Sequence, residues 1–318
     1  MVRVVRSGTV VAASGFSAER DAEALRKAMK GLGCDAAAVS GLLCRRSNDQ
    51  RQAVRSAYGR LFGRELLKDL SKELRGHHED VCVALCLTPS QFDAVEMRRA
   101  VKGAGTHEDI LIEILVTRSN AQLAALKTDY GAMFKRDLVK DVESDTSFHF
   151  RKLMRQRDES GRVDRQRAAA DAKALKAAGA DRWGTDESRF NAVMASQGFP
   201  QLQLLIQEYG KISRKTLQDA IRSEFSGAIR DGLLAIAKAA QHTPSFLAER
   251  LQLAMKGLGT KDKTLVRLIV SRSEVDLVQV KEAFFRLFGQ SLERWVRGDT
   301  SGKYRDALLL LVQGNRSV

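Results

Sequence analysis

The stretch that decides the fold is the glycine-rich word Met29-Lys-Gly-Leu-Gly-Cys34. It returns three times, at intervals of 72, 79 and 75 residues, as Val101-Lys-Gly-Ala-Gly-Thr106, Ala180-Asp-Arg-Trp-Gly-Thr185 and Met255-Lys-Gly-Leu-Gly-Thr260. A second word follows in three copies, as RRSNDQ from Arg45, TRSNAQ from Thr117 and SRSEVD from Ser271, whereas the third copy has ASQGFPQ. Self-similarity at such a period is the signature of a repeat architecture, so we predict four copies of one supersecondary unit.

Within one copy the apolar residues follow a helical period that is interrupted at Gly, Asn or Ser. In the first copy the pattern predicts helices near residues 18–30, 35–45, 49–61, 64–74 and 78–87. Helices this short must pack together to be stable, so the predicted fold is all-α, with four five-helix repeats. The expected divisions are a tail over 1–16 and repeats over 17–87, 88–159, 160–242, which includes a linker, and 243–318.

The residue after each glycine pair is expected to cap the second helix of its repeat. Thr106, Thr185 and Thr260 have side chains suited to this position. Cys34 replaces the threonine in the first repeat, so that helix start is expected to be weaker.

The composition limits the cellular context. With 3 Pro and 6% aromatic residues, the chain of 318 residues leans toward helices. The longest apolar run, Ala307 to Val312, is far short of the roughly 20 residues that span a bilayer, and no charged-then-apolar leader opens the chain. We therefore expect a cytoplasmic protein, with unconventional export left open. The 4 Cys are expected to be ordinary thiols rather than a disulfide framework or a metal site: Cys34, Cys44, Cys82 and Cys86.

A carboxylate follows each glycine-rich word at a fixed interval. Counted from the second glycine, an acid stands 40 residues on in every copy: Glu73 after Gly33, Asp145 after Gly105, Glu224 after Gly184 and Asp299 after Gly259. Plain helix connections with glycine caps would account for one glycine, but they do not account for the glycine pair and the repeated interval.

Calcium binding is the chemistry that fits this pattern. Ca²⁺ takes about 6–8 oxygen ligands and accepts backbone carbonyls beside a bidentate carboxylate. A tight glycine loop can turn three carbonyls inward, and one later acid brings the protein's share to about five oxygens. An open position would take a lipid phosphoryl oxygen, so calcium would bridge protein and membrane. Without lipid the affinity should be weak, near about 10⁻⁴ M, and calcium and lipid should strengthen each other's binding.

The loop tips suit a membrane interface, where an apolar side chain enters the headgroup region and a cation meets phosphate. The apolar tips are Leu32, Ala104, Trp183 and Leu258, and the flanking cations are Lys30, Lys102, Arg182 and Lys256.

From Phe16 to Gly314 the chain resembles the annexin family, because the K-G-x-G-T word followed by an acid about forty residues on is similar to that family's calcium site. The resemblance implies a slightly curved disc of four repeats with calcium loops on the convex face. It also implies calcium-dependent binding to acidic phospholipid membranes of the phosphatidylserine kind, a role in membrane organisation, trafficking or repair, and self-association on membranes. The implied carbonyl ligands beside the four acids are Met29, Gly31 and Gly33; Val101, Gly103 and Gly105; Gly179, Arg182 and Gly184; and Met255, Gly257 and Gly259.

Family members also have a central polar channel. It would either conduct ions or form a structural polar core, because buried charges must be paired. The matching positions are Asp93, Glu96, Glu113, Arg118, Arg267 and Arg272.

Two other classes were weighed on the residues. An enzyme is not expected, because the 5 His form no recognisable catalytic motif and the glycine loops lack the spacing of a phosphate-binding loop. A basic helical scaffold that binds nucleic acid or an acidic protein would explain the formal charge of +14 but not the four carboxylate intervals. Calcium dependence of binding separates this class from a membrane binder. No partner of the N-terminal tail can be predicted.

Overall fold

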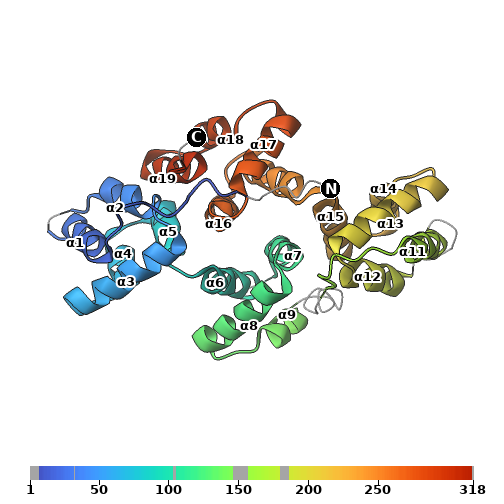
Figure 1. The fold of residues 1–318 in the computed structure, drawn as a ribbon, viewed down its shortest axis with the longest axis horizontal. Helices are drawn as coiled ribbons and strands as arrows, with labels where there is room; N and C mark the ends of the chain where they lie inside the picture. Colours follow the sequence, from blue (N-terminus) through green and yellow to red (C-terminus); the bar gives the residue numbers. More distant parts are fainter. Residues whose placement is uncertain (1–6, 32, 103–104, 146–156, 180–185, 317–318) are drawn as a thin grey trace. The chain divides into compact units, whose positions relative to one another are not determined.

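The computed structural model describes residues 7–31, 33–102, 105–145, 157–179 and 186–316. These residues form 18 helices and no strand, which confirms the predicted all-α class (Figure 1). Among them, no helix combines the length and the apolar character needed to cross a membrane. The chain divides into two compact units, one of residues 1–92 and 247–318 and the other of residues 93–246.

Each repeat contributes a run of short helices. Repeat 1 contains α1 (Ala18–Ala28), α2 (Ala36–Leu43), α3 (Asn48–Phe62), α4 (Leu66–Glu73) and α5 (Gly76–Leu85). Repeat 2 contains α6 (Pro89–Val101), α7 (Glu108–Thr117), α8 (Asn120–Phe134) and α9 (Leu138–Asp145). Repeat 3 contains α11 (Arg165–Ala178), α12 (Glu187–Ser196), α13 (Phe199–Ile212), α14 (Leu217–Glu224) and the first part of α15 (Gly227–Met255). Repeat 4 contains the rest of α15, α16 (Asp262–Arg272), α17 (Leu277–Phe288), α18 (Leu292–Asp299) and α19 (Gly302–Gln313).

The long helix α15 bends at His242, whose backbone (φ −161°, ψ 95°) is not helical. Pro244 follows two residues later, at the start of the second part, where the missing N–H of proline leaves no helical hydrogen bond unmade. The predicted start of repeat 4, residue 243, lies beside this bend.

Capping boxes begin the third helix of repeats 1 and 2. The oxygen of Ser47 accepts the N–H of Gln50, and the side chain of Gln50 accepts the N–H of Ser47 in return. Ser119 and Gln122 do the same at the start of α8. Such reciprocal bonds satisfy two N–H groups that a helix start would leave unpaired, which explains the recurring R-S-N word.

The predicted threonine caps are wrong. In each repeat the N-cap of the second helix is the following residue; Asp35 and Asp186 accept a backbone N–H there, whereas His107 and Lys261 make no side-chain capping bond. These N-caps are Asp35, His107, Asp186 and Lys261. In repeat 1 the carboxylate of Asp35 accepts the N–H of Ala38 at 2.9 Å, so Cys34 does not weaken that helix start. Thr185 lies outside the described residues.

A polar triad of a buried tyrosine, a buried aspartate and an exposed arginine joins the third helix to the fourth in two repeats. In repeat 1 Tyr58 donates to Asp69 at 2.8 Å, and the Arg64 guanidinium contacts the same carboxylate at 2.6 Å. The hydrogen bonds from Arg64 lower the pKa of Asp69 most, and the bond from Tyr58 adds to the effect against the opposing influence of burial. The counterparts in repeat 2 are Tyr130, Asp141 and Arg136.

The N-terminal segment is held against repeat 4 within the first unit. The N–H of Val10 donates to the carbonyl of Ser273 at 2.9 Å, and the Thr9 hydroxyl donates to the carbonyl of Leu311 at 2.6 Å. A methyl group on Gly314 would lie 1.9 Å from the carbonyl oxygen of Thr9, so the close approach requires glycine. In the same unit α5 packs against α16 and α19, which joins repeats 1 and 4.

The four cysteines are free thiols, as predicted. Three of them are buried, and burial raises the pKa of Cys44 and of Cys86 to about 12. These thiols are therefore protonated and unreactive at neutral pH. Cys34 is partly exposed.

Candidate functional site

All four glycine-rich loops are closed by the same hydrogen bond. An N–H two residues beyond the second glycine donates to a carbonyl in the last turn of the preceding helix. The pairs are Asp35 with Ala28 (2.9 Å), His107 with Ala100 (3.0 Å), Asp186 with Ala178 (3.0 Å) and Lys261 with Ala254 (2.8 Å). The donor residue follows the acceptor residue by seven positions in repeats 1, 2 and 4 and by eight positions in repeat 3. The third loop therefore carries one additional residue.

The glycines hold a backbone conformation that other residues rarely adopt. The first glycine of the pair has φ 117° at Gly31 and 115° at Gly257. The second has φ 91° at Gly33, 95° at Gly105 and 83° at Gly259. Glycine reaches such angles without a side-chain penalty. Repeats 1 and 4 therefore share one loop conformation at both positions.

Each predicted acid is the last residue of the fourth helix of its repeat, and in repeat 4 the acid contacts the loop. Thr260 Oγ1 lies 2.6 Å from Oδ2 of Asp299 and 2.9 Å from its main-chain oxygen. The threonine hydroxyl thus holds the carboxylate at the end of the loop. The interval of 40 residues in the sequence corresponds to a contact in space.

Two further acids lie beside their loops. Burial raises the pKa of the Cys34 thiol most, and the negative charges of Glu73 and Asp35 raise it further, which places Glu73 near the loop of repeat 1. In repeat 3 a methyl group on Gly179 would lie 3.4 Å from Cγ of Glu224. Glu73 and Glu224 end α4 and α14, as Asp299 ends α18.

The remaining predicted site residues cannot be placed. Asp145 ends α9, and its side chain lies outside the described residues. Also outside the described residues are Leu32, Gly103, Ala104, Arg182, Trp183 and Gly184.

The fourth loop is anchored at its base and exposed at its tip. In repeat 4 Met255 is buried, Lys256 is exposed, and Leu258 has a relative exposure of 108%. The same step from a buried apolar residue to an exposed lysine occurs at Met29-Lys30 and Val101-Lys102. A single exposed leucine is common on protein surfaces, so the meaning of Leu258 comes from its place at the tip of the loop.

A metal ion at these loops would depend on main-chain oxygens. Within the described part of the chain, no three His, Cys, Asp or Glu side chains gather in a way that would hold a metal ion. One carboxylate beside loop carbonyls is an all-oxygen donor set, which suits Ca²⁺ and not Zn²⁺, since zinc is held mainly by nitrogen and sulfur. The residues present therefore fit calcium.

Sequence reasoning missed a polar cluster that joins repeat 1 to the end of the fourth loop. The two ring nitrogens of His77 lie 2.9 Å from Asp80 and 3.2 Å from Asp262, the first residue of α16. Lys263 pairs with Asp80 as well, and the ring of Tyr304 lies 5.4 Å from that of His77. The sequence carried no signal of this cluster, because Asp262 is 185 residues from His77.

The charged positions that were matched to a central channel are buried, and several are paired within their own unit. Arg118 contacts both carboxylate oxygens of Asp93 at 2.7 Å, and Arg99 pairs with Glu96 at 2.5 Å. Glu113 and Arg267 are also buried. In the first unit Arg272 pairs with Asp276. Local pairing of this kind is what burial of charge requires.

Comparison with known proteins identifies the relatives of the chain. The Annexin family model matches residues 20–85, 92–156, 170–236 and 246–311. Human annexin A7 is 45% identical over 316 residues, which cover 98% of this chain and 65% of that protein. Mouse annexin A4 is 45% identical over 315 residues, which cover 98% of this chain and 99% of that protein.

Solved structures agree with the family match. Annexin III has a TM-score of 0.95 at 43% identity and covers 99% of this chain and 100% of its own. Calcium-bound annexin (Sm)1 has a TM-score of 0.85 at 34% identity, over 96% of this chain and 93% of its own. The glycine loops, the acids that end each fourth helix and the four matched repeats lead to one conclusion: the chain belongs to the annexin family.

Proposed function

We propose that this chain binds acidic phospholipid membranes when Ca²⁺ is held at its glycine loops. Annexins are in general calcium-dependent phospholipid-binding proteins, and one of the similar solved structures is calcium-bound. The observation that carries the proposal is the fourth loop, where Asp299 meets Thr260 while Leu258 projects fully into solvent. One loop thus combines an acid for the ion with an apolar tip for the bilayer.

The residues of the fourth loop have separate tasks in this proposal. The carbonyls of Met255, Gly257 and Gly259 and the carboxylate of Asp299 would hold the ion, and Thr260 keeps that carboxylate in place. When bound, Ca²⁺ would supply the positive charge that attracts a lipid phosphoryl oxygen.

The neighbouring side chains would then contact the bilayer itself. Leu258 would enter the headgroup region, and Lys256 would pair with lipid phosphate. The other three loops would act in the same way through Glu73, Asp145 and Glu224.

The competing explanation is attraction by charge alone, since the chain carries +14. Sedimentation with phosphatidylserine vesicles at physiological salt separates the two. Pelleting in calcium, with release of the protein by a chelator, is the expected result. Equal pelleting with and without calcium would refute the proposal.

A matched pair of variants sharpens this experiment. Replacing Glu73, Asp145 and Asp299 together by Ala should reduce calcium-dependent pelleting to what the third loop alone supports and leave the helical circular dichroism unchanged. The control replaces three exposed acids away from the loops by Ala, which removes the same charge and should leave calcium dependence intact: Glu23, Glu282 and Asp306.

The cellular role that follows is organisation, trafficking or repair of membranes from the cytoplasmic side, with recruitment as calcium rises. Membrane-bound copies would associate with one another. Imaging a fluorescent fusion before and after a calcium ionophore tests the recruitment, and a distribution that does not change would contradict it.

A further inference from the structure

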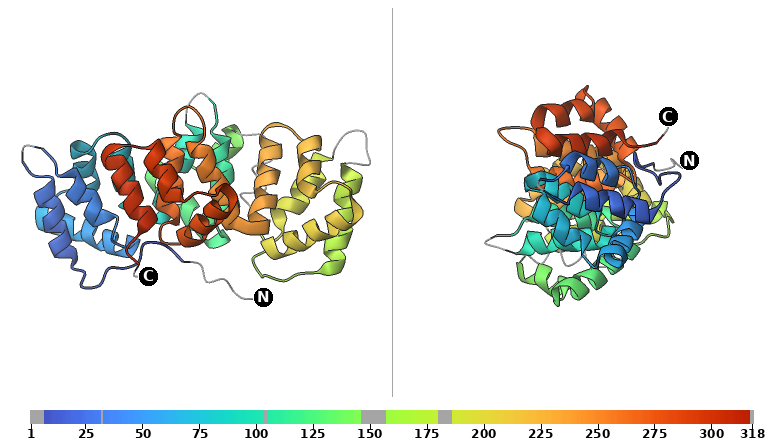
Figure 2. Two further views of the ribbon diagram at one scale, coloured as in Figure 1. Left: turned by 90° about the horizontal axis from the view of Figure 1, so that it is seen from above. Right: turned by 90° about the vertical axis from the view of Figure 1, so that its left-hand side faces the viewer.

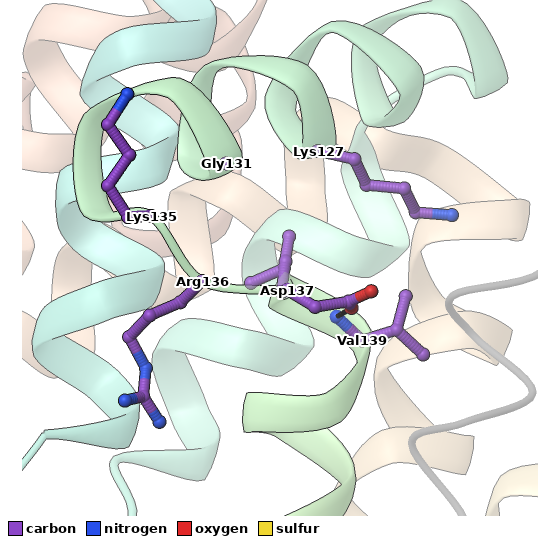
Figure 3. Close-up of a pocket in the computed structure, with 7 residues that line it drawn as sticks. Lys127, Gly131, Lys135, Arg136, Asp137 and Val139 are labelled. Atoms are coloured by element: carbon purple, nitrogen blue, oxygen red, sulfur yellow. Dashed lines mark hydrogen bonds between the residues drawn. The ribbon is translucent and has the colours of Figure 1, made fainter.

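Two features outside the glycine loops bring polar side chains together. The first is a surface pocket of about 400 Å³ where α8 ends and α9 begins (Figure 3). Lys127 and Lys135 line it, but their ammonium ends point to opposite sides in Figure 3, so the pocket does not gather them around one ligand. The second feature is the polar cluster around His77, whose side chains do contact one another.

This cluster joins helices of repeats 1 and 4, and we call it the α5–α16 joint. Its members are His77 and Asp80 of α5, Asp262 and Lys263 of α16, and Tyr304 of α19. In this unit the helix α5 packs against α16 and α19 (Figure 1 and Figure 2). Two contacts cross from α5 to α16: His77 meets Asp262 at 3.2 Å, and Lys263 pairs with Asp80. The N-terminal parts of two helices from different repeats are therefore tied together.

The three helices that meet at the joint have no capping bond of their own. The N-cap residues Arg75, Lys261 and Ser301 make no side-chain hydrogen bond to the starts of α5, α16 and α19. A helix start leaves four N–H groups without an intrahelical partner, and a capping side chain normally holds the chain there. Contacts with neighbouring helices therefore fix where these three starts lie.

Each of these helices begins directly after a part of a proposed calcium site. The helix α5 begins three residues after Glu73, the acid of the first site. The helix α16 begins three residues after Gly259 of the fourth loop, and α19 begins three residues after Asp299, the acid of the fourth site. A displacement at either site would move the helix start beside it, and the joint would pass that movement to the other site.

Tyr304 connects the joint with the acid of the fourth site. Its hydroxyl lies 3.5 Å from the main-chain oxygen of Asp262, and its ring lies 5.4 Å from that of His77. Burial raises the pKa of Tyr304 most, the negative charge of Asp262 adds to this, and the charge of Asp299 contributes as well. The joint therefore lies within electrostatic reach of Asp299.

We propose that the joint couples the first and fourth calcium sites, so that an ion at either site strengthens binding at the other. This inference rests on the proposed function, since it concerns the same loops. An ion at the fourth loop would fix the start of α16, and the contacts of His77 and Lys263 would then fix the start of α5 beside Glu73; the coupling is reciprocal. Repulsion between the two ions would instead weaken binding of the second. Because the side chains of His77 and Lys263 are 42% and 48% exposed, the coupling should be modest, about twofold to fivefold in affinity.

Equilibrium dialysis of the full chain against radiolabelled calcium tests the coupling. It is done without vesicles, because a shared bilayer would couple two loops through effective concentration alone. All proteins carry Asp145→Ala and Glu224→Ala, which leaves the first and fourth sites. Adding Glu73→Ala or Asp299→Ala gives two single-site proteins, and the sum of their isotherms describes two independent sites. We expect the two-site protein to bind its second ion about twofold to fivefold more tightly than this sum predicts.

Variants of the joint test whether it carries the coupling. His77→Ala should abolish the coupling, so that the two-site isotherm equals the sum of the single-site isotherms measured with the same change. Asp262→Ala removes the other side of the contact and should have the same effect. The matched control is Arg60→Ala, which breaks the exposed ion pair of Arg60 with Glu19 (3.0 Å) in the same unit and should leave the coupling intact.

The outcomes separate this inference from the proposed function. A merely structural cluster would lower the melting temperature of His77→Ala and leave the coupling unchanged, and this result would overturn the inference. Independent binding by the two-site protein with His77 intact would overturn it as well. If the single-site proteins bind no calcium, the calcium-dependent function itself fails; if they bind calcium and the two-site protein shows no coupling, only the role of the joint fails.

Discussion

Replacing Asp299 by Ala should remove one calcium ion from the membrane-bound protein without unfolding it. The carboxylate of Asp299 lies at the end of the fourth loop, 2.6 Å from Thr260 Oγ1. It is partly exposed, and Thr260 would keep the main-chain oxygen of residue 299 as an acceptor, at 2.9 Å. The fold therefore loses little when the carboxylate is removed.

The loss at the ion is much larger. A bidentate carboxylate would supply two of about five protein oxygens. At about 2.4 Å, the attraction between Ca²⁺ and one negative charge is about 3.5 kcal/mol at the dielectric constant of water, which corresponds to about 400-fold in affinity. If the wild-type loop binds Ca²⁺ with a dissociation constant of about 10⁻⁴ M, the dissociation constant of the variant would exceed about 10⁻² M. Its loop would then stay empty.

Equilibrium dialysis against radiolabelled calcium, in the presence of phosphatidylserine vesicles, counts the ions directly. Asp299→Ala should bind one ion fewer per chain than the wild type. Glu282→Ala removes one exposed acid of α17 instead and should bind the wild-type number of ions. An unchanged count in Asp299→Ala, with circular dichroism intact, would refute the assignment of this residue as a ligand.

Three further predictions concern the fold. Gly314→Ala should destabilise the protein by about 1–3 kcal/mol in thermal unfolding and expose the N-terminal segment to protease, because the methyl group would meet the Thr9 carbonyl; Gly210→Ala, which has open space, is the control and should not destabilise. The pKa of Asp141 lies below its ordinary value through hydrogen bonds from Arg136, so its stabilisation is present above the unfolded-state pKa and is lost as pH falls through the folded-state pKa. The free energy of unfolding, measured in urea at pH 7 and at pH 3, should therefore differ less between the two pH values in Asp141→Asn than in the wild type. An equal difference in both proteins would contradict this. A water-soluble thiol reagent should modify one cysteine per native chain, namely Cys34, and all 4 after unfolding, because the other three thiols are buried; rapid modification of more than one native thiol would show that burial to be wrong.

Much of the architecture could be predicted from the sequence, because its signals are local or periodic. In repeat 1 the five helices begin and end within two residues of the predicted bounds. Glycine pairs mark the loops because few other residues adopt the positive φ found at Gly31 and Gly257. The constant interval to the acid was visible because each repeat inserts helices of similar length between the two.

The errors and omissions in the site have a common cause. The side chain of Thr260 was predicted to cap α16, but the sequence did not reveal that the end of α18 lies within 2.6 Å of its hydroxyl. The same limit hid the contact of His77 with Asp262, since the two residues lie 185 positions apart in the sequence. Such contacts depend on how helices from different repeats pack.

By itself the sequence determined the repeats, the helices, the flexible glycine positions and the acids that accompany them, because backbone preference and apolar period act over a few residues. Only the tertiary structure decided which acid meets its loop, which charges pair and where a pocket opens. Thr260 and Asp299 illustrate the division: the constant interval between loop and acid is legible in the sequence, whereas the contact of the Thr260 hydroxyl with the carboxylate exists because the end of α18 packs against the fourth loop. Hydrogen bonds and pockets are set by distances of a few ångströms between elements, and those distances are fixed only when the helices pack.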